Sequence, residues 1–387
     1  MGRYIVFAVF LGLIFMPYTA LAMVSGPCYK CHAMHFSQSP WPTGWQSEGP
    51  NDYLLVKKGG GGHCSPCVSC HSSETSSTYE DLGGGLKVPI VFYFGASAPT
   101  EYLAGGNFWW VKEGLGGNDT KGHNVFEDED DEDLSAGAPG DSGFAGCGTN
   151  PCHLNLSRPA GIAGMPELDG KYGCEGCHLN VRHHANDHPN GESGLVNSAD
   201  QGWYRFLSGH ISGSGQGVEG YEDGHWEAGQ PDLARGQANN HNEYLGNEDT
   251  GGYGFNLGHT TTAFCTGCHG TFHQSQYSSS SDSWIRHPSD AVLIQDPGNP
   301  GEYAYIGGAS HEYDPLSPVA SPTVDGTPDG TVTPGPAFVM CLSCHRPHGS
   351  PYPDMLRWDY SQQIAGSDPG EGTLDQGCFY CHTQKDN

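Results

Sequence analysis

Residues 341–350 read CLSCHRPHGS, and this short stretch carries two features that decide how the chain folds. Cys341, Cys344 and His345 form a C-x-x-C-H sequence, the pattern by which haem is attached to a c-type cytochrome chain. In that pattern the two cysteines hold the porphyrin covalently, and the histidine binds the iron from one side. His348 follows only three residues later, so the stretch supplies a second imidazole whose role has to be explained.

The C-x-x-C-H pattern occurs six times along the chain. With 15 cysteines and 21 histidines in 387 residues, chance alone would give about 0.03 such motifs. The six motifs are Cys28, Cys31 and His32; Cys67, Cys70 and His71; Cys174, Cys177 and His178; Cys265, Cys268 and His269; Cys341, Cys344 and His345; and Cys378, Cys381 and His382.

A seventh candidate, CGTNPCH at residues 147–153, has four residues between its cysteines instead of two. Gly148 and Pro151 favour a turn, which lets the longer loop bulge away from a porphyrin. A histidine directly after the second cysteine argues against a disulfide or two free thiols. We therefore expect Cys147, Cys152 and His153 to hold a haem, which makes seven covalently attached haem c groups and leaves Cys64 unattached.

Two other interpretations of the cysteines are a disulfide scaffold and a set of zinc ribbons. Disulfides suit an oxidising compartment, but they do not require a histidine after every second cysteine. Zinc ribbons also use C-x-x-C pairs, but zinc would not need seven units with the histidine in the same place each time. Both remain minor alternatives.

The second axial ligand decides whether an iron mainly passes electrons or binds a substrate. Fourteen histidines remain after the seven motif histidines, against five methionines beyond Met1 and Met16. This supply favours two histidines on every iron, because neutral imidazole is a good iron ligand. The expected second ligands are His123, His273, His287, His311 and His348, together with His35 and one histidine of the cluster His183, His184 and His188, for which we take His184. His63, His210, His225, His241 and His259 stay open.

Geometry restricts which haem each of these histidines can reach. Axial ligands approach an iron from opposite faces of the porphyrin, whereas residues three or four apart on a helical turn have Cβ atoms only about 5–6 Å apart. His348 therefore cannot bind the haem that His345 holds. The same argument separates His35 from His32 and His273 from His269, so each such histidine, if it is a ligand, serves a neighbouring haem.

Composition predicts the fold class. Only 36% of residues are hydrophobic, with 59 glycines and 27 prolines, which is poor material for a large apolar core. We expect a multihaem cytochrome c fold of mostly coil and loops, with a short helix at each motif and minimal strand, such as one or two short strands in residues 87–94. The chain would wrap around a continuous row of haems as one domain, residues 23–387.

The N-terminus and the net charge bear on location and partners. Residues 1–22 contain Arg3, an apolar run and a small-residue cleavage site, as in a secretory signal peptide; a transmembrane anchor is the alternative. A formal net charge of −28 argues against nucleic acid and anionic membranes as partners. The acidic run at 127–133 is interpreted as a solvated loop, with cation or mineral contact as the alternative.

The motifs and their order resemble the OmcS-type multihaem cytochromes, surface proteins of metal-reducing bacteria that polymerise into conductive filaments. The similar stretches are CYKCHAMHFS, NFWWVKEG, DTKGHNV, FCTGCHGTFHQSQY, WIRHPSD, VMCLSCHRPHGS and CFYCHTQKD. The resemblance implies bis-histidine haems in alternating parallel and T-shaped pairs, with His35 binding a haem of the adjacent subunit. It also implies that His123, His273, His287, His311 and His348 are second ligands within the chain. The family member carries six haems, and CGTNPCH has no counterpart there; the acidic run and the RHHANDH cluster look like additions.

We therefore expect a secreted heptahaem electron-transfer protein without catalytic residues, polymerised into an extracellular filament. Its partners would be further copies of itself, other redox cytochromes, or extracellular electron acceptors such as metal oxides. The alternatives are a monomeric periplasmic electron shuttle and a multihaem nitrite- or hydroxylamine-type oxidoreductase. Multihaem reductases often mark the catalytic haem with an altered motif, whereas every motif here ends in histidine.

Overall fold

The computed structural model describes a little under half of the chain. The described residues are 24, 26–32, 55, 67–112, 114–126, 156, 173–179, 181–184, 195–196, 204–207, 217–229, 241–247, 258–266, 289–293, 311–333, 335–364 and 377–381. Six of the seven attachment motifs lie wholly or partly within these ranges, and the motif at 147–153 lies outside them.

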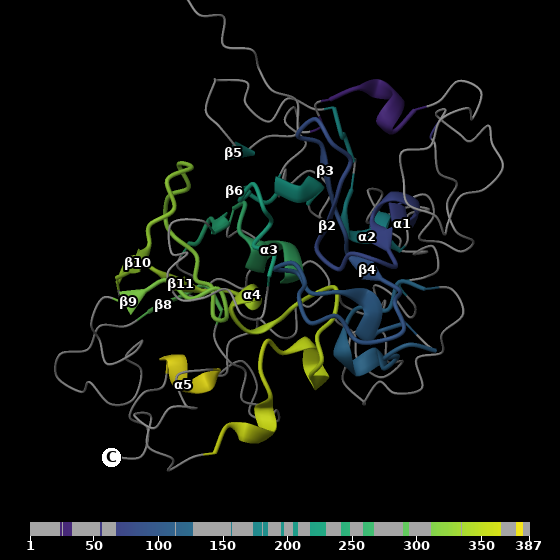
Figure 1. The fold of residues 1–387 in the computed structure, drawn as a ribbon. Coiled ribbons are helices and arrows are strands. Elements are labelled where there is room, and N and C mark those ends of the chain that lie inside the picture. The colour runs from purple at the N-terminus through teal and green to yellow at the C-terminus, as the bar shows by residue number, and fades with distance from the viewer. Residues whose placement is uncertain are drawn as a thin grey trace, which may run out of the picture.

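Each of these six motifs forms one short helix (Figure 1). The helices are η1 (Cys28–Lys30), α1 (Cys67–Cys70), α2 (Cys174–Cys177), α3 (Thr261–Thr266), α4 (Cys341–Cys344) and α5 (Cys378–Cys381). A single turn suffices because residues three apart lie on the same helix face, which brings both sulfurs to one side. The predicted helical turns at these motifs are confirmed.

The remaining helices are 3-10 turns that shape the loops between motifs. They are η3 (Phe108–Trp110), η4 (Asp119–Lys121), η6 (Tyr204–Phe206), η9 (Pro353–Met355) and η10 (Tyr360–Gln362). Three of them begin with a side-chain cap, in which Asn107, Asn118 or Asp359 accepts a hydrogen bond from a backbone N–H of the first turn. Such caps satisfy amide groups that have no partner inside the helix.

The strands are two or three residues long and form small separate sheets. Parallel β1 (Ser72–Ser73) and β4 (Phe92–Tyr93) pair, as do antiparallel β2 (Tyr79–Asp81) and β3 (Lys87–Pro89), β8 (Ala291–Val292) and β11 (Phe338–Val339), and β9 (His311–Glu312) and β10 (Thr331–Val332). A three-stranded sheet has the order β5 (Leu195–Val196), β6 (Gly220–Tyr221) and β7 (Glu243–Tyr244). The described chain is thus mostly coil with short helices and minimal strand, as predicted, although the short strands are more numerous than the one or two expected.

The strand region expected at residues 87–94 is divided into β3 and β4. β3 pairs with β2, whereas β4 pairs with β1, so the chain changes partner between Pro89 and Phe92. Pro89 has no backbone N–H to continue a ladder. The Val91 and Phe92 amides instead donate to the carbonyl oxygen of His71, at 2.9 and 3.2 Å. The division therefore ties this segment to the histidine of the second motif.

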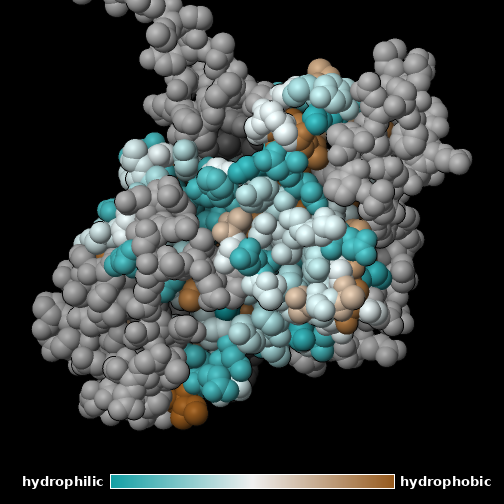
Figure 2. Space-filling view, viewed as in Figure 1, coloured by the Kyte–Doolittle hydropathy of each residue, from teal (hydrophilic) through white to brown (hydrophobic). Residues whose placement is uncertain are grey.

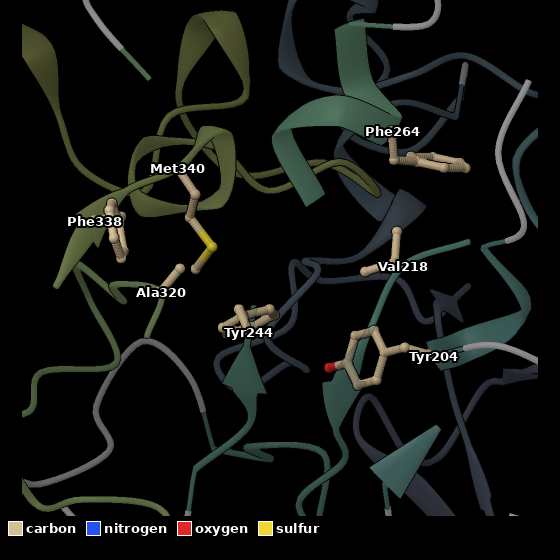
Figure 3. Packing of buried hydrophobic residues seen from close by; sticks show 7 residues of the cluster. All are labelled: Tyr204, Val218, Tyr244, Phe264, Ala320, Phe338 and Met340. Carbon is tan, nitrogen blue, oxygen red and sulfur yellow. The ribbon is translucent and has the colours of Figure 1, made fainter. Parts of the chain in front are cut away.

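The buried apolar side chains form four small clusters instead of one core. The largest contains Tyr204, Val218, Tyr244, Phe264, Ala320, Phe338 and Met340, with Tyr244 between the two sides of the group (Figure 3). Each cluster packs against partly buried motif cysteines. The largest contacts Cys177 and Cys265, and the other three contact Cys381, Cys174, and the pair Cys31 and Cys70, respectively. The apolar material of the described chain is therefore distributed along the attachment motifs.

On the visible face, the coloured surface is largely hydrophilic, with apolar residues scattered among polar ones (Figure 2). Among the described residues, the exposed large apolar side chains are those of Tyr29, Val181, Tyr360 and Ile364. None of the helices in the described part of the chain has the length and apolar character needed to cross a membrane.

Candidate haem-binding sites

The motif cysteines are placed for attachment of a group and not for crosslinking. No cysteine in the described ranges is in a disulfide. Desolvation raises the pKa of Cys177 to about 11 and those of Cys344 and Cys381 to about 12, with the neighbouring cysteines adding to the last two. Such thiols lie at the edges of the apolar clusters, where the apolar face of a porphyrin would be shielded from water.

Neighbouring motifs lie close enough together for their cysteines to influence one another. The pairs are Cys31 with Cys70, Cys67 with Cys174, Cys265 with Cys341, and Cys344 with Cys381. Two of these contacts include a hydrogen bond between the side chains, which raises the pKa of Cys67 and lowers that of Cys341. The motifs therefore form two runs in space, η1 to α1 to α2 and α3 to α4 to α5 (Figure 1).

A histidine contact joins the two runs. His348 follows α4 in the sequence, but its ring lies beside that of His178, which directly follows α2, with the ring centroids 5.9 Å apart. This histidine pair links the two motifs, although Cys341 lies 163 positions after His178 in the sequence. The spacing of His345 and His348 predicts that His348 serves a haem other than that of His345, and the placement beside His178 agrees with this prediction.

Motif histidines face other histidines at a recurrent separation. The ring centroids are 6.3 Å apart for His32 and His184, 6.1 Å for His71 and His183, and 5.9 Å for His178 and His348. An iron bound to nitrogen at about 2 Å on each side, with about 1 Å from each nitrogen to its ring centroid, requires a centroid separation of about 6 Å. The three separations therefore suit an iron between two imidazoles.

A fourth pair is formed by His345 and His123. The two side chains are close enough for His345 to lower the pKa of His123, in addition to the larger effect of desolvation. The backbone N–H of His123 donates to the carbonyl oxygen of Pro347 at 3.3 Å, which fixes the segment of η4 against the loop that follows α4. The expected second ligand His123 thus lies near His345, the histidine of the motif in α4.

Backbone carbonyls orient these imidazoles. Four of them donate a hydrogen bond from Nδ1 to a backbone carbonyl oxygen. The pairs are His71 with Pro89 at 2.8 Å, His123 with Pro347 at 3.0 Å, His178 with Arg205 at 2.8 Å, and His345 with Asp354 at 2.7 Å. Because a carbonyl oxygen only accepts, each Nδ1 carries the proton and each Nε2 keeps its lone pair. This arrangement is common among metal-binding histidines, whose second nitrogen is held by an outer partner.

Two of the four carbonyls belong to residues with an unusual backbone conformation. Arg205 has φ of 47° and Asp354 has φ of 58°, both in the left-handed region. Non-glycine residues adopt this region at an energetic cost, and such residues gather at functional sites. The strained backbone here points a carbonyl at His178 and at His345. The sequence contains no signal for these two partners, because neither residue type favours a positive φ strongly.

His348 is held by a close backbone approach. Its N–H donates to the carbonyl oxygen of Gly105 at 2.8 Å, and the next residue, Gly349, has φ of 110° and accepts a hydrogen bond from the Asn107 N–H at 3.0 Å. A Cβ on Gly349 would lie 2.8 Å from the oxygen of Asn107. Only glycine therefore allows the loop to seat His348 beside His178.

Desolvation keeps several imidazoles in the neutral form. It lowers the pKa of His123 and of His178, and lowers that of His348 well below the usual range, with His178 adding to the last effect. The pKa of His183 falls to about 4 through desolvation and through its neighbours His71 and His184. Metal binding requires neutral imidazole, so these shifts favour ligation at neutral pH.

Two histidines that the sequence left open are resolved differently by the structure. Both ring nitrogens of His241 face carbonyl oxygens, of Asn242 at 2.7 Å and of Asp329 at 3.2 Å, and its ring stacks on Tyr313 with centroids 3.5 Å apart. No nitrogen of His241 is available for iron. His259, just before α3, donates from Nδ1 to Gly217 at 2.8 Å, the same arrangement as in the paired histidines.

The RHHANDH cluster differs from the expectation. The sequence predicts one ligand among His183, His184 and His188, with His184 as the expected one. The structure places two of them opposite motif histidines, His184 by His32 and His183 by His71. The only sequence signal for the placement of His183 is the double histidine itself. Adjacent side chains do not face the same way, so two consecutive histidines can reach two different motifs.

Several expected site residues lie outside the described residues. They are residues 1–22, His35, Cys147, Cys152, His153, Cys268, His269, His273, His287 and His382. For His311 the structure describes only the backbone, in β9. Their assignments stay predictions.

The ligand chemistry of the described motifs fits haem. A haem iron needs only two protein ligands because the porphyrin supplies the rest, and each histidine pair above supplies two imidazoles. Short helices ending in C-x-x-C-H and facing imidazole pairs define a multihaem c-type cytochrome.

Comparison with known proteins finds one family model and two solved structures that are similar to the chain. Residues 335–387, which contain the last two motifs, match the family model described as the doubled CXXCH motif. Two solved structures from Geobacter sulfurreducens are similar to the chain, an outer membrane cytochrome S filament (17% identity, TM-score 0.45, covering 94% of this chain and 93% of that chain) and the OmcS nanowires (20% identity, TM-score 0.40, covering 94% and 95%). Both similarities are distant, and no curated protein sequence matches the chain.

Proposed function

We propose that this protein is an exported electron-transfer protein that carries seven haem c groups and conducts electrons along a continuous row of bis-histidine haems. The observation that carries the proposal is the pairing of motif histidines with second histidines at iron-spanning distance. When bound, each haem supplies a one-electron Fe(III)/Fe(II) couple.

The chain's own residues set the conditions for this role. Where a second imidazole faces the motif histidine, the two imidazoles would hold the iron from both sides. A substrate would then have to displace a histidine to reach the iron. Carbonyl partners fix the ring orientations, and desolvation keeps the rings neutral. These features support electron transfer over a nitrite- or hydroxylamine-type oxidoreductase.

The arrangement of the motifs supports a continuous path. Within each run, cysteines of successive motifs lie close together. The pair of His348 and His178 connects α2, at the end of the first run, with α4 in the second run. In Figure 1 the N-terminal helix η1 and the C-terminal helix α5 lie at opposite ends of this arrangement. A row that reaches from one end of the molecule to the other can continue into another copy.

We further propose that the protein polymerises into an extracellular filament, in which His35 binds a haem of the adjacent subunit. A head-to-tail contact between different surfaces produces an open filament when the rotation does not close. Exposed apolar side chains support such a contact at both ends. Tyr29 belongs to η1, and Tyr360 and Ile364 lie in or next to η10. The segment of η10 is tied to α5 by the hydrogen bond from Cys378 N to the Gln363 side chain.

The test uses the mature protein from the producing cells. We expect pyridine haemochrome analysis to give seven haems per chain, the electron paramagnetic resonance (EPR) spectrum to be low-spin, and electron microscopy to show filaments with a repeating subunit. Substantial high-spin iron would contradict bis-histidine ligation. Dispersed particles would contradict the filament and favour a monomeric periplasmic shuttle, and rapid turnover of nitrite or hydroxylamine would favour the enzyme.

A further inference from the structure

Two consecutive histidines lie beside two different attachment motifs. The ring of His184 is 6.3 Å from that of His32, with an interplanar angle of 30°, and the ring of His183 is 6.1 Å from that of His71, with an angle of 17°. His32 ends the first motif and His71 ends the second. A dipeptide thus faces both N-terminal motifs at once.

We propose that His183 and His184 supply the second axial ligands of two different haems, that of Cys67–His71 and that of Cys28–His32, and thereby join these haems into one unit. The proposal rests on the proposed function, because it requires both motifs to carry haem. It assigns ligand roles to both members of the dipeptide, one haem to each. With His348 and His123 at two further haems, three of the seven haems remain for His35, His273, His287 and His311, so one of these four expected second ligands is not needed.

Backbone geometry allows one dipeptide to serve two irons. Consecutive Cα atoms are about 3.8 Å apart, and neighbouring side chains on a turn do not face each other. The two rings therefore cannot approach one iron from the same side, but they can reach two irons that lie close together. The proximity of Cys31 to Cys70 shows that the two motifs are neighbours in the structure.

Contacts around the dipeptide hold it in this position. The N–H of Val24, four residues before the first motif, donates to the carbonyl oxygen of His183 at 2.9 Å. The ring of Phe206 contacts that of His183 edge-on, with centroids 5.8 Å apart. The dipeptide is thus fixed to the N-terminal segment by its backbone and to η6 by one side chain.

The two side chains also differ from a histidine that the protein chain alone holds in place. Both are exposed within the protein chain, although the contacts above hold their positions. His241, in contrast, is buried and uses both ring nitrogens in hydrogen bonds to carbonyl oxygens. A structural histidine in this molecule therefore looks different from His183 and His184.

The test measures the spin state of the iron in the full-length, haem-loaded protein. We expect His183→Ala and His184→Ala each to convert one haem per chain from low-spin to high-spin, and the double variant to convert two. Added imidazole should restore the low-spin EPR spectrum in every case. His241→Phe, which changes a histidine whose two ring nitrogens both lie against carbonyl oxygens, is the control and should leave the spectrum unchanged.

A second set of variants assigns each ligand to its haem. In a background with Cys28→Ser and Cys31→Ser, which lacks the first haem, His184→Ala should produce no high-spin iron, whereas His183→Ala should still produce one. If a variant fails to accumulate, His183→Met and His184→Met keep a ligand, and each should raise the reduction potential of one haem.

The outcomes separate the inference from the function on which it rests. A single variant with an unchanged spectrum, or a double variant with one high-spin haem, would overturn the assignment of two haems to the dipeptide. In that case the unaltered protein would still be low-spin with its full haem content. Absence of haem from the unaltered protein would instead overturn the proposed function itself.

Discussion

The loop after α4 and the dipeptide of His183 and His184 both bring imidazoles to motifs that are distant in the sequence, but they hold these imidazoles differently. His348 lies beside His178, and a tight backbone approach at Gly349 fixes its position. His183 lies beside His71, and contacts with Val24 and Phe206 hold it there. One region depends on close backbone packing and the other on contacts of an exposed dipeptide, so different changes should break them.

The largest effect is expected from Gly349→Ala. The new Cβ would lie 2.8 Å from the Asn107 oxygen and 2.9 Å from Val111 Cγ2, at a φ of 110°. We expect a loss of about 3 kcal/mol in stability, from backbone strain and from the clash. The loss of stability should appear as a lower thermal midpoint followed at the Soret band, with high-spin iron appearing where His348 leaves its position.

Gly335→Ala is the matched control for this variant. Gly335 has a similar φ of 105°, but a Cβ there meets nothing within 4 Å. We expect it to lose only about 1–2 kcal/mol from strain, with no change in spin state. Equal effects of the two variants would show that the close approach of the backbone does not hold His348.

Acid should separate the two regions. The pKa of His183 is lowered to about 4 and that of His348 is lowered well below its usual range, so both bind protons more tightly in the unfolded chain. Stability is therefore fully present above the ordinary histidine pKa and is lost as the pH falls through the folded-state values. We expect the exposed His183 to be released first, near or below about pH 4.

An EPR titration from pH 7 downwards measures this order. High-spin iron should appear first in a form that His183→Ala already shows, and later in a form attributable to loss of His348. The opposite order would mean that the close approach at Gly349 gives the loop after α4 no greater resistance to acid than the N-terminal dipeptide has.

The smallest effect is expected at His241, which belongs to neither region. His241→Phe keeps the stacking on Tyr313 but loses the hydrogen bonds to Asn242 and Asp329. We expect a loss of about 1–2 kcal/mol, because the carbonyl oxygen of the buried Asn242 loses this partner. The spin state and haem content should not change, and a new high-spin signal would show that His241 is a ligand after all.

The sequence was most informative where a covalent pattern fixes local structure. Cysteines three apart followed by histidine predicted both the single helical turns and their chemistry, and low apolar content predicted a chain of coil with little strand. The division of residues 87–94 was not foreseeable, because it depends on the carbonyl of His71 accepting from Val91 and Phe92.

The candidate site was predictable in its first ligands and only partly in its second. The spacing of His345 and His348 excluded a shared iron, and the structure places them in separate pairs. The partner of each histidine could not be predicted, because it depends on how distant loops pack. Nothing in the sequence marks the carbonyls of Arg205 and Asp354, since their orientation comes from a backbone conformation that these residue types seldom adopt.

The four apolar clusters have a consequence for how the molecule is made. Each is small and borders motif cysteines, so the described part of the chain offers four separate apolar groups for condensation, each next to cysteines that are to be modified. Marginal cores of this kind are generally stabilised by a bound group, whose binding energy becomes folding energy. Biosynthesis is then expected to couple maturation to folding, and the N-terminal end would stay unfinished until residues 183–184 have been synthesised and delivered to it.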